Sequence, residues 1–312
     1  MKALTYSDIT LIPSYTDLVS RKEADTSRYL GHKLFALPVM PSNMECVINE
    51  NIAKFLSEND YFYVMHRFKI DILEFVRKAN EQNWRTISIS IGVKQSDKNL
   101  IENIIACNYH VDYITIDIAH GHSIQMRDML EFLRQKFNNV FIIAGNIATP
   151  EAAHDLSKWG ANAIKVGVGP GAACSTAEKT GFHSPMFSTI QEIARYAKCD
   201  IIADGGVRSN GDIAKALVAG ADWVMAGSLF ATCIDSPAAI LPDGTKIYYG
   251  SASQHCKGHT NNVEGKMIHI VSNGMSYAKK LNEIKQDLQS SITYSGGYSL
   301  DAFNFTKWQS LK

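Results

Sequence analysis

Short runs of apolar residues recur along the chain from residue 37 onwards, and stretches with helical periodicity lie between them. The runs are rich in Val, Ile and Tyr, which favour β-strands. Their nearly continuous apolar character is typical of parallel strands that are covered by helices. Eight strands are predicted, at residues 37–40, 61–65, 86–91, 113–118, 140–144, 163–168, 200–203 and 223–226.

The segments between the runs carry helix signals. Residues 71–83 have apolar side chains at helical spacing, which predicts an amphipathic helix. Thr149 and Pro150 are residues favoured at an N-cap and at the first helical position. Further helices are predicted at residues 213–219 and 276–289. Eight alternations of strand and helix without a long polar linker predict a single domain of the α/β class, a closed (β/α)8 TIM barrel that covers all 312 residues.

Composition narrows the class of protein. Hydrophobic residues make up 46% of the chain, enough for a large core. The formal net charge is zero, so a nucleic-acid partner is not expected. No apolar run approaches the roughly 20 residues that cross a bilayer, and the N-terminus lacks a signal-peptide pattern, so a cytoplasmic protein without membrane contact is predicted. The cysteines are scattered and form no CxxC pair, which predicts neither disulfides nor a zinc site. They are Cys46, Cys107, Cys174, Cys199, Cys233 and Cys256.

The loops that follow the predicted strands hold the candidate chemistry. Gly169-Pro170-Gly171 ends the sixth strand, and Cys174 follows three residues later, where a barrel enzyme would place a nucleophile. The alternative is an inert, small hydrophobic cysteine beside an ordinary turn. Glycines after the seventh and eighth strands, at 205–206 and 227, are placed to hold a phosphate on backbone N–H groups, or else they only turn the chain.

Two segments lie beyond the predicted barrel. Residues 254–263 show little periodicity, which predicts a mobile flap over the site, and residues 275–312 form a C-terminal extension that includes the helix predicted at 276–289. Lys165 lies on the sixth strand, where a buried lysine could form a Schiff base. A structural or phosphate-binding lysine is the simpler interpretation.

Several motifs in order resemble the IMP dehydrogenase and GMP reductase family. They are GVGPGAACST (167–176), DGGVRSNGDIAKAL (204–217), YYGSAS (248–253) and VEGK (263–266). The resemblance runs from about Tyr6 to Asp301 and is closest to the bacterial GMP reductase branch. Residues 71–83 lead directly into the third strand, which leaves no room for the regulatory domain that the dehydrogenase usually inserts. Residues 254–263 also lack the Arg-Tyr pair with which the dehydrogenase activates water.

The resemblance implies NADPH-dependent reductive deamination of GMP to IMP and ammonia. Cys174 would form a covalent thioimidate with the purine, and Thr176 with Glu264 would transfer the proton. The implied nucleotide-binding residues are Asp204, Gly205, Gly206, Gly227, Ser228, Gly250, Ser251, Ala252 and Gly265. The implied cofactor residues are Ser20, Arg21, Arg67, Asp117, Ile118, Ala119, Ser290, Ser291 and Thr293, of which residues 290–293 would reach a neighbouring subunit.

The resemblance also implies a homotetramer and a potassium ion on the carbonyls of Gly169, Gly171 and Cys174. Arg21 and Arg67 would suit the 2′-phosphate of NADPH, since guanidinium groups match phosphate geometry. Without a GxGxxG motif, a Rossmann mode of cofactor binding is not expected. Three alternatives stay open: an IMP dehydrogenase without its regulatory domain, a Schiff-base lyase that uses Lys165, and a nucleotide sensor without turnover.

Overall fold

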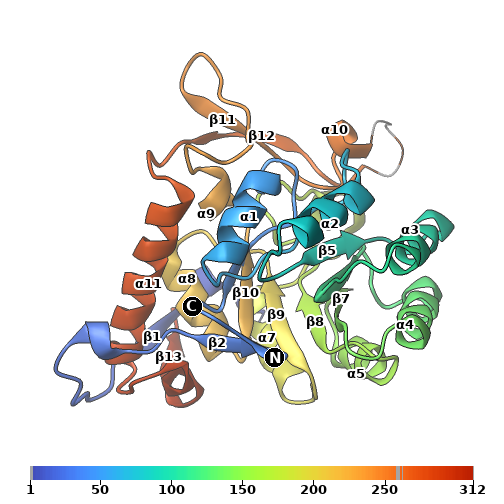
Figure 1. The fold of residues 1–312 in the computed structure, drawn as a ribbon. Coiled ribbons are helices and arrows are strands. Elements are labelled where there is room, and N and C mark those ends of the chain that lie inside the picture. Colours follow the sequence, from blue (N-terminus) through green and yellow to red (C-terminus); the bar gives the residue numbers. More distant parts are fainter. Residues whose placement is uncertain (1–2, 258–260, 262, 312) are drawn as a thin grey trace.

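The computed structural model describes residues 3–257, 261 and 263–311. A curled parallel sheet forms its centre (Figure 1), with the strand order β4-β10-β9-β8-β7-β6-β5. The strands are β4 (Val39–Pro41), β5 (Ser88–Ile91), β6 (Tyr113–Asp117), β7 (Phe141–Ile147), β8 (Ala163–Val166), β9 (Asp200–Asp204) and β10 (Trp223–Ala226). Seven of the eight predicted strands are thus confirmed, one of them (223–226) with both ends as predicted and the others with ends shifted by at most three residues.

The eighth predicted strand, residues 61–65, is reduced to a single bridge. Met65 pairs in parallel with Ile89 of β5, and on the other side the Asp60 carbonyl accepts a hydrogen bond from Ala36, just before β4. This segment is held by packing more than by a ladder of backbone hydrogen bonds, because residues 62–64 are completely buried. It fills the gap between β5 and β4 and completes an α/β barrel of the TIM type.

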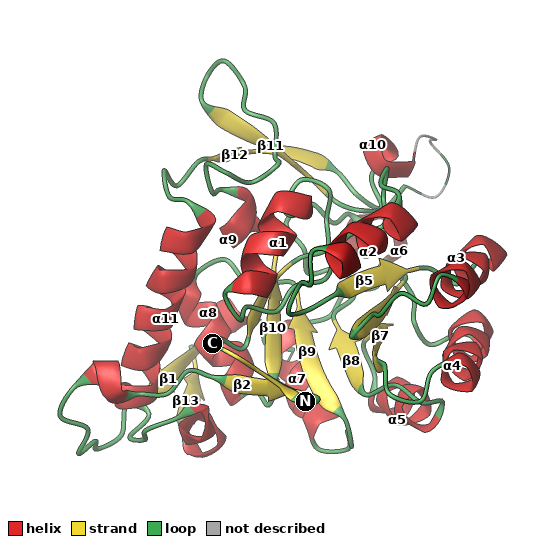
Figure 2. Ribbon diagram, in the orientation of Figure 1, coloured by secondary structure: helices red, strands yellow, loops and turns green. Residues whose placement is uncertain are grey.

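Helices cover the outside of the barrel (Figure 2). Those between the strands are α1 (Glu50–Glu58), α2 (Ile72–Glu81), α3 (Gln95–Ala106), α4 (Ile124–Lys136), α5 (Pro150–Lys158), α6 (Thr176–Thr180), α7 (Met186–Ala194), α8 (Asn210–Val218) and α9 (Ser228–Ala231). The predicted N-cap of α5 is confirmed, because the Thr149 hydroxyl accepts a hydrogen bond from the N–H of Ala152. The helix predicted at 213–219 begins three residues earlier, since Ser209 and Asp212 form a capping box.

Additional elements surround this barrel. Strands β1 (Ile9–Ile12) and β13 (Lys307–Ser310) pair antiparallel and join the two ends of the chain, and β2 (Arg28–Leu30) pairs with β3 (Lys33–Phe35). The hairpin of β11 (Thr245–Tyr249) and β12 (Met267–Val271) projects beyond the carboxyl ends of the barrel strands. The short helices are η1 (Tyr6–Asp8), η2 (Arg21–Glu23), η3 (Leu300–Phe305) and α10 (Gln254–Lys257).

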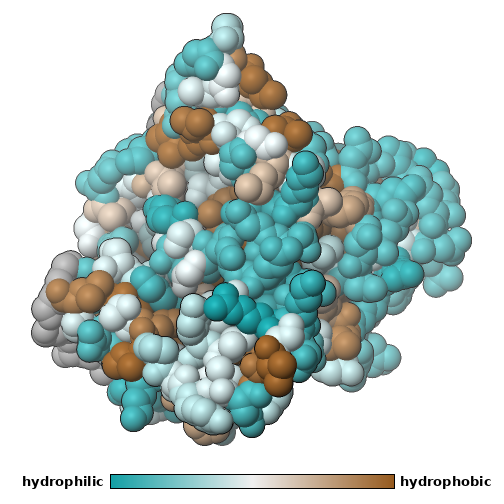
Figure 3. Space-filling view, turned by 90° about the vertical axis from the view of Figure 1, so that its left-hand side faces the viewer, coloured by the Kyte–Doolittle hydropathy of each residue, from teal (hydrophilic) through white to brown (hydrophobic). Residues whose placement is uncertain are grey.

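The C-terminal helix α11 (Tyr277–Tyr294) is longer than predicted and takes in residues 290–293. The part of the predicted flap at 258–260 and 262 lies outside the described residues. Among the residues that the structure describes, no helix has both the length and the apolar character to cross a membrane. On the α11 side of the molecule, apolar side chains form small patches that are separated by polar ones (Figure 3).

An aromatic cluster fills the amino-terminal end of the barrel. Tyr113 and Trp223 are the first residues of β6 and β10, Phe35 ends β3 just before β4, and Phe62 lies in the segment 61–65; each of the four is at most 2% exposed. Their rings pack edge to face, with centroids 5.3 Å apart for Phe35 and Phe62 and 4.8 Å apart for Phe62 and Tyr113. We call these four residues the aromatic plug. They close the interior at this end, so the hollow part of the barrel lies at the carboxyl ends of the strands.

Candidate active site

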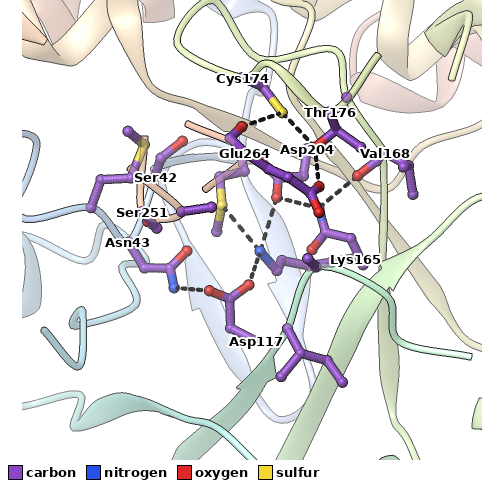
Figure 4. Close-up of a pocket in the computed structure, with 18 of the residues that line it drawn as sticks. Ser42, Asn43, Asp117, Lys165, Val168, Cys174, Thr176, Asp204, Ser251 and Glu264 are labelled. Atoms are coloured by element: carbon purple, nitrogen blue, oxygen red, sulfur yellow. Dashed lines mark hydrogen bonds and ion pairs between the residues drawn. The ribbon is translucent and has the colours of Figure 1, made fainter. Parts of the chain in front are cut away.

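A cavity of about 370 Å³ opens at the carboxyl ends of the strands. Its walls come from the loops after β4, β6, β7, β8 and β9, and from two segments that flank the predicted flap (Figure 4). A second cavity of about 440 Å³ adjoins it and shares Ala119, Val168, Thr176 and Glu264 with it. Loops at this end of a TIM barrel are the usual place for catalytic groups.

Three predicted catalytic residues form a connected chain in the cavity. The Cys174 thiol lies 3.2 Å from the Thr176 hydroxyl, and that hydroxyl donates a 2.7 Å hydrogen bond to the Glu264 carboxylate. Figure 4 shows the three side chains converging on one wall. Because the Thr176 hydrogen points to the carboxylate, the Thr176 oxygen can accept a proton from sulfur. A proton can therefore move between Cys174 and Glu264 through Thr176.

Backbone pairing brings Glu264 to the cysteine across 90 residues of sequence. Ser175 N–H donates to the Glu264 carbonyl at 2.8 Å, and Lys266 N–H donates to the Ala173 carbonyl at 2.8 Å. Cys174 and Gly265 thus form an antiparallel bridge. The segment after the flap is fixed against the cysteine loop, which holds the carboxylate at its place.

A buried cation lies at the base of the same cavity. The Lys165 ammonium is 2.7 Å from Asp117 and 2.9 Å from Asp204, and the lysine side chain is 2% exposed. Burial would lower the pKa of Lys165, but the two carboxylates outweigh it and raise that pKa well above its ordinary value. For Asp117 burial alone would raise the pKa. Lys165 mainly, helped by Arg67 and Asn43, keeps the pKa of Asp117 below its ordinary value instead. A lysine held in the charged form is no nucleophile, which opposes the Schiff-base interpretation.

Six glycines help to line a third cavity of about 170 Å³ that adjoins the main one, and we call this space the glycine lobe. Gly171, Gly205, Gly250 and Gly265 lie there, and a Cβ at Gly205 would come within 2.8 Å of the Pro170 ring. Gly205 also has φ of +99°, a conformation that favours glycine. The predicted nucleotide-binding residues Asp204, Gly205, Gly250, Ser251, Ala252 and Gly265 therefore share one space. Gly206, Gly227 and Ser228 lie on the adjoining loops and do not line it.

The predicted cofactor residues separate into two groups. Arg67, Asp117, Ile118 and Ala119 line the main cavity, where the Arg67 guanidinium donates to the Asp117 carbonyl at 3.1 Å. The second group lies at η2 and α11, away from the lining residues, and it comprises Ser20, Arg21, Ser290, Ser291 and Thr293. A role of this second group in a neighbouring subunit's site stays a prediction.

The second group is held together by contacts within this chain. Arg21 donates to the hydroxyls of Ser290 and Tyr294 at 3.3 and 3.2 Å, and its guanidinium lies over the Tyr294 ring. The Thr293 hydroxyl is buried and donates to the Gln289 carbonyl of its own helix. Arg21 is exposed and Ser20, Ser290 and Ser291 are half-buried, so another molecule could reach these four, whereas Thr293 is buried.

The loop predicted to hold potassium has the donor chemistry that this ion prefers, which is a set of backbone carbonyls. Gly169 has φ of +81°, which turns the loop sharply before Cys174. Nearby carbonyls already have partners: Gly171 accepts from Cys174 N–H at 3.1 Å, and Pro170 accepts from Arg208 at 3.1 Å. A carbonyl oxygen has two lone pairs, so the Gly171 carbonyl can still serve a cation.

Sequence analysis missed three side chains of the site. Asn43 donates to Asp117 at 3.0 Å and Asn146 donates to Asp204 at 2.8 Å, and Tyr248 lines the glycine lobe. The two asparagines follow predicted strands, so their position at the ends of strands was the available signal. Tyr248 lies on β11, outside the barrel strands, and its signal was the motif YYGSAS, which it begins.

The fold and the site together define an α/β-barrel protein with a cysteine, threonine and glutamate relay at the barrel mouth. The chain belongs to the IMP dehydrogenase / GMP reductase family, whose domain model matches residues 3–307. It is 46% identical to a GMP reductase of Mycoplasma mycoides over 97% of this chain and 96% of that protein. It is 48% identical to one of Acidovorax sp. (96% and 93%) and 43% identical to one of Lactobacillus acidophilus (100% and 96%).

Proposed function

We propose that this protein is a GMP reductase, which converts GMP and a reduced nicotinamide cofactor to IMP and ammonia. The Cys174–Thr176–Glu264 relay is the observation that carries the proposal, because it joins a nucleophile to a proton donor within one wall of the cavity. The full-length relatives named above support the same activity over that of an IMP dehydrogenase without its regulatory domain. The family and fold agree with an oxidoreductase.

The relay accounts for the difficult part of the reaction, which is expulsion of an amine. The Cys174 thiolate attacks carbon-2 of the purine, and the thiol proton passes through Thr176 to Glu264. The same path returns a proton to the exocyclic amine, which leaves as ammonia and breaks the C2–N bond. The product is a thioimidate on Cys174. A reduced nicotinamide held by Arg67 and the segment 117–119 would supply a hydride to carbon-2, and the C–S bond would then break to release IMP.

The remaining predicted residues are assigned to binding. Asp204 accepts ribose hydroxyls, and the N–H groups of the loops at 205–206, 227–228 and 250–252 hold the phosphate. Arg67 and the segment 117–119 contact the cofactor, and the adjoining cavity gives a ligand longer than a mononucleotide room to extend. We further propose NADPH as the cofactor, a potassium ion on the carbonyls of the loop 169–174, a homotetramer and a cytoplasmic location.

The test is NADPH consumption and ammonia release with GMP, in the wild type and in Cys174→Ala. We expect both signals in the wild type and neither in the variant, because no covalent intermediate can form. Circular dichroism and thermal melting check that the variant is folded. Oxidation of IMP with NAD, without GMP-dependent loss of NADPH, would replace the proposal with a dehydrogenase. Equal NADPH loss in both proteins would remove Cys174 from the mechanism.

A further inference from the structure

We propose that Lys165 is a positioning residue, whose ammonium group holds Asp117 and Asp204 in the orientation in which they face the two ligands of the site. This inference rests on the proposed function, in which Asp204 faces the nucleotide and Asp117 faces the cofactor. The lysine itself contacts neither ligand in this assignment. It acts through the two carboxylates that it joins, and so it links the two halves of the cavity.

The three side chains come from different strands of the barrel. Lys165 lies on β8, Asp117 ends β6 and Asp204 ends β9, and Figure 4 shows the ammonium between the two carboxylates. The Nζ atom has three contacts: Asp117 Oδ1 at 2.7 Å, Asp204 Oδ2 at 2.9 Å and Met225 Sδ at 3.9 Å. An ammonium group has three hydrogens, so these contacts use its full donor capacity. It therefore has no donor left for a ligand.

The two carboxylates remain accessible where the lysine is not. Their side chains are 17% and 18% exposed, whereas the Lys165 side chain is 2% exposed. Lys165 and Asn146 both bond Oδ2 of Asp204, and among the described residues this leaves Oδ1 to a ligand. Asn43 fixes the other side of Asp117. Asp204 is thus held on one oxygen by the protein and open on the other, whereas both oxygens of Asp117 are held by the protein while its side chain stays partly exposed.

Removing the ammonium would change the charge state of the pair. Without the ammonium the two carboxylates repel each other, and although Arg67 still lies beside Asp117, one of the pair then binds a proton more readily. A protonated carboxyl accepts hydrogen bonds from a ligand poorly. Loss of the lysine should therefore weaken nucleotide use most at acidic pH, and a purely structural lysine would produce no such dependence on pH.

The experiment compares wild type, Lys165→Met and Lys165→Arg at pH 6 and pH 8. For Lys165→Met we expect kcat/KM for GMP, relative to wild type, to fall about tenfold further at pH 6 than at pH 8, which corresponds to one pKa unit. Lys165→Arg retains the charge and should show the same relative activity at both values. Lys215→Met, which removes a lysine on α8 outside the cavity, is the control and should keep wild-type activity at both.

A second readout does not depend on turnover. Infrared spectra at pH 6 should show an additional protonated carboxyl band in Lys165→Met, and Asp204→Asn or Asp117→Asn in that background should remove it. If Lys165→Met does not fold, Lys165→Gln replaces it. Equal relative activity at both pH values, or no additional band, would overturn the positioning role. A wild type that does not reduce GMP would instead refute the proposed function, while the infrared band still tests Lys165.

Discussion

Replacing Thr176 with valine tests whether the relay works as its geometry indicates. Valine has nearly the shape of threonine, so the change removes the hydroxyl and little else. The hydroxyl bridges sulfur at 3.2 Å and the Glu264 carboxylate at 2.7 Å. A hydrogen bond to a charged group contributes about 1.5–3 kcal/mol, and the variant should lose roughly that much stabilisation of the deamination step. This corresponds to a fall in kcat of about 10- to 150-fold.

The assay follows two half-reactions separately. GMP with NADPH requires expulsion of ammonia and should be slowed by the full factor. IMP with NADP⁺ requires the Cys174 thiolate and hydride transfer to form the thioimidate, but no proton on a departing amine, and the variant should still give a burst of NADPH in single turnover. Since the relay serves thiol deprotonation in both halves and protonation of the amine in deamination alone, the deamination half should be impaired more strongly.

Two further variants make this result specific. Thr176→Ser retains the hydroxyl and should recover most of the activity. Thr189→Val removes a buried hydroxyl on α7 that donates to the Pro185 carbonyl at 3.1 Å, away from the cavity, and should leave kcat unchanged. A Thr176→Val enzyme with wild-type deamination, or one that loses both halves equally, would refute the assignment of Thr176 to proton transfer.

Two other predictions concern stability. Burial first, and the charge of Asp222 second, raise the pKa of Asp200 to about 6, although Arg28 opposes the shift. The folded protein therefore loses stability as the pH rises from about 4 to 6, where this carboxyl must give up its proton. Asp200→Asn should raise the free energy of unfolding by about 1–2 kcal/mol at pH 8, because partial exposure reduces the full effect, and should leave it unchanged at pH 4; urea titrations that show no gain at pH 8 would contradict this. Phe62→Ala opens a cavity in the aromatic plug and should lower the free energy of unfolding by about 3–5 kcal/mol, with kcat per folded molecule unchanged. Calorimetry measures the loss of stability and active-site titration gives kcat per folded molecule. A lower kcat would show that the plug supports the site directly.

The strands of the barrel could be predicted because each is buried on both faces. Such strands appear in sequence as short apolar runs, and seven of the eight runs form ladders. Residues 61–65 have the same composition yet form one bridge, because their burial comes from side-chain packing. Composition reports burial, and it does not report how many backbone hydrogen bonds a segment makes.

The three residues of the proposed relay were predictable from motifs, whereas their supporting residues were not. Asn43 and Asn146 bond carboxylates on other strands, 74 and 58 residues away in sequence. Nothing local to an asparagine indicates such a partner, since the barrel closure brings them together. The charge state of Lys165 was open for the same reason: its environment consists of residues on β6 and β9, and only the folded barrel shows both carboxylates beside it.

The aromatic plug closes the barrel interior at one end. Because Phe62 and Trp223 fill that end, the described residues leave ligands a single opening, at the carboxyl ends of the strands. Under the proposed function, the nucleotide, the cofactor and ammonia would all pass through that opening, and a ligand bound nearer the mouth would block the exit of one bound deeper. The order in which products leave would then follow their depth in the barrel rather than their individual affinities.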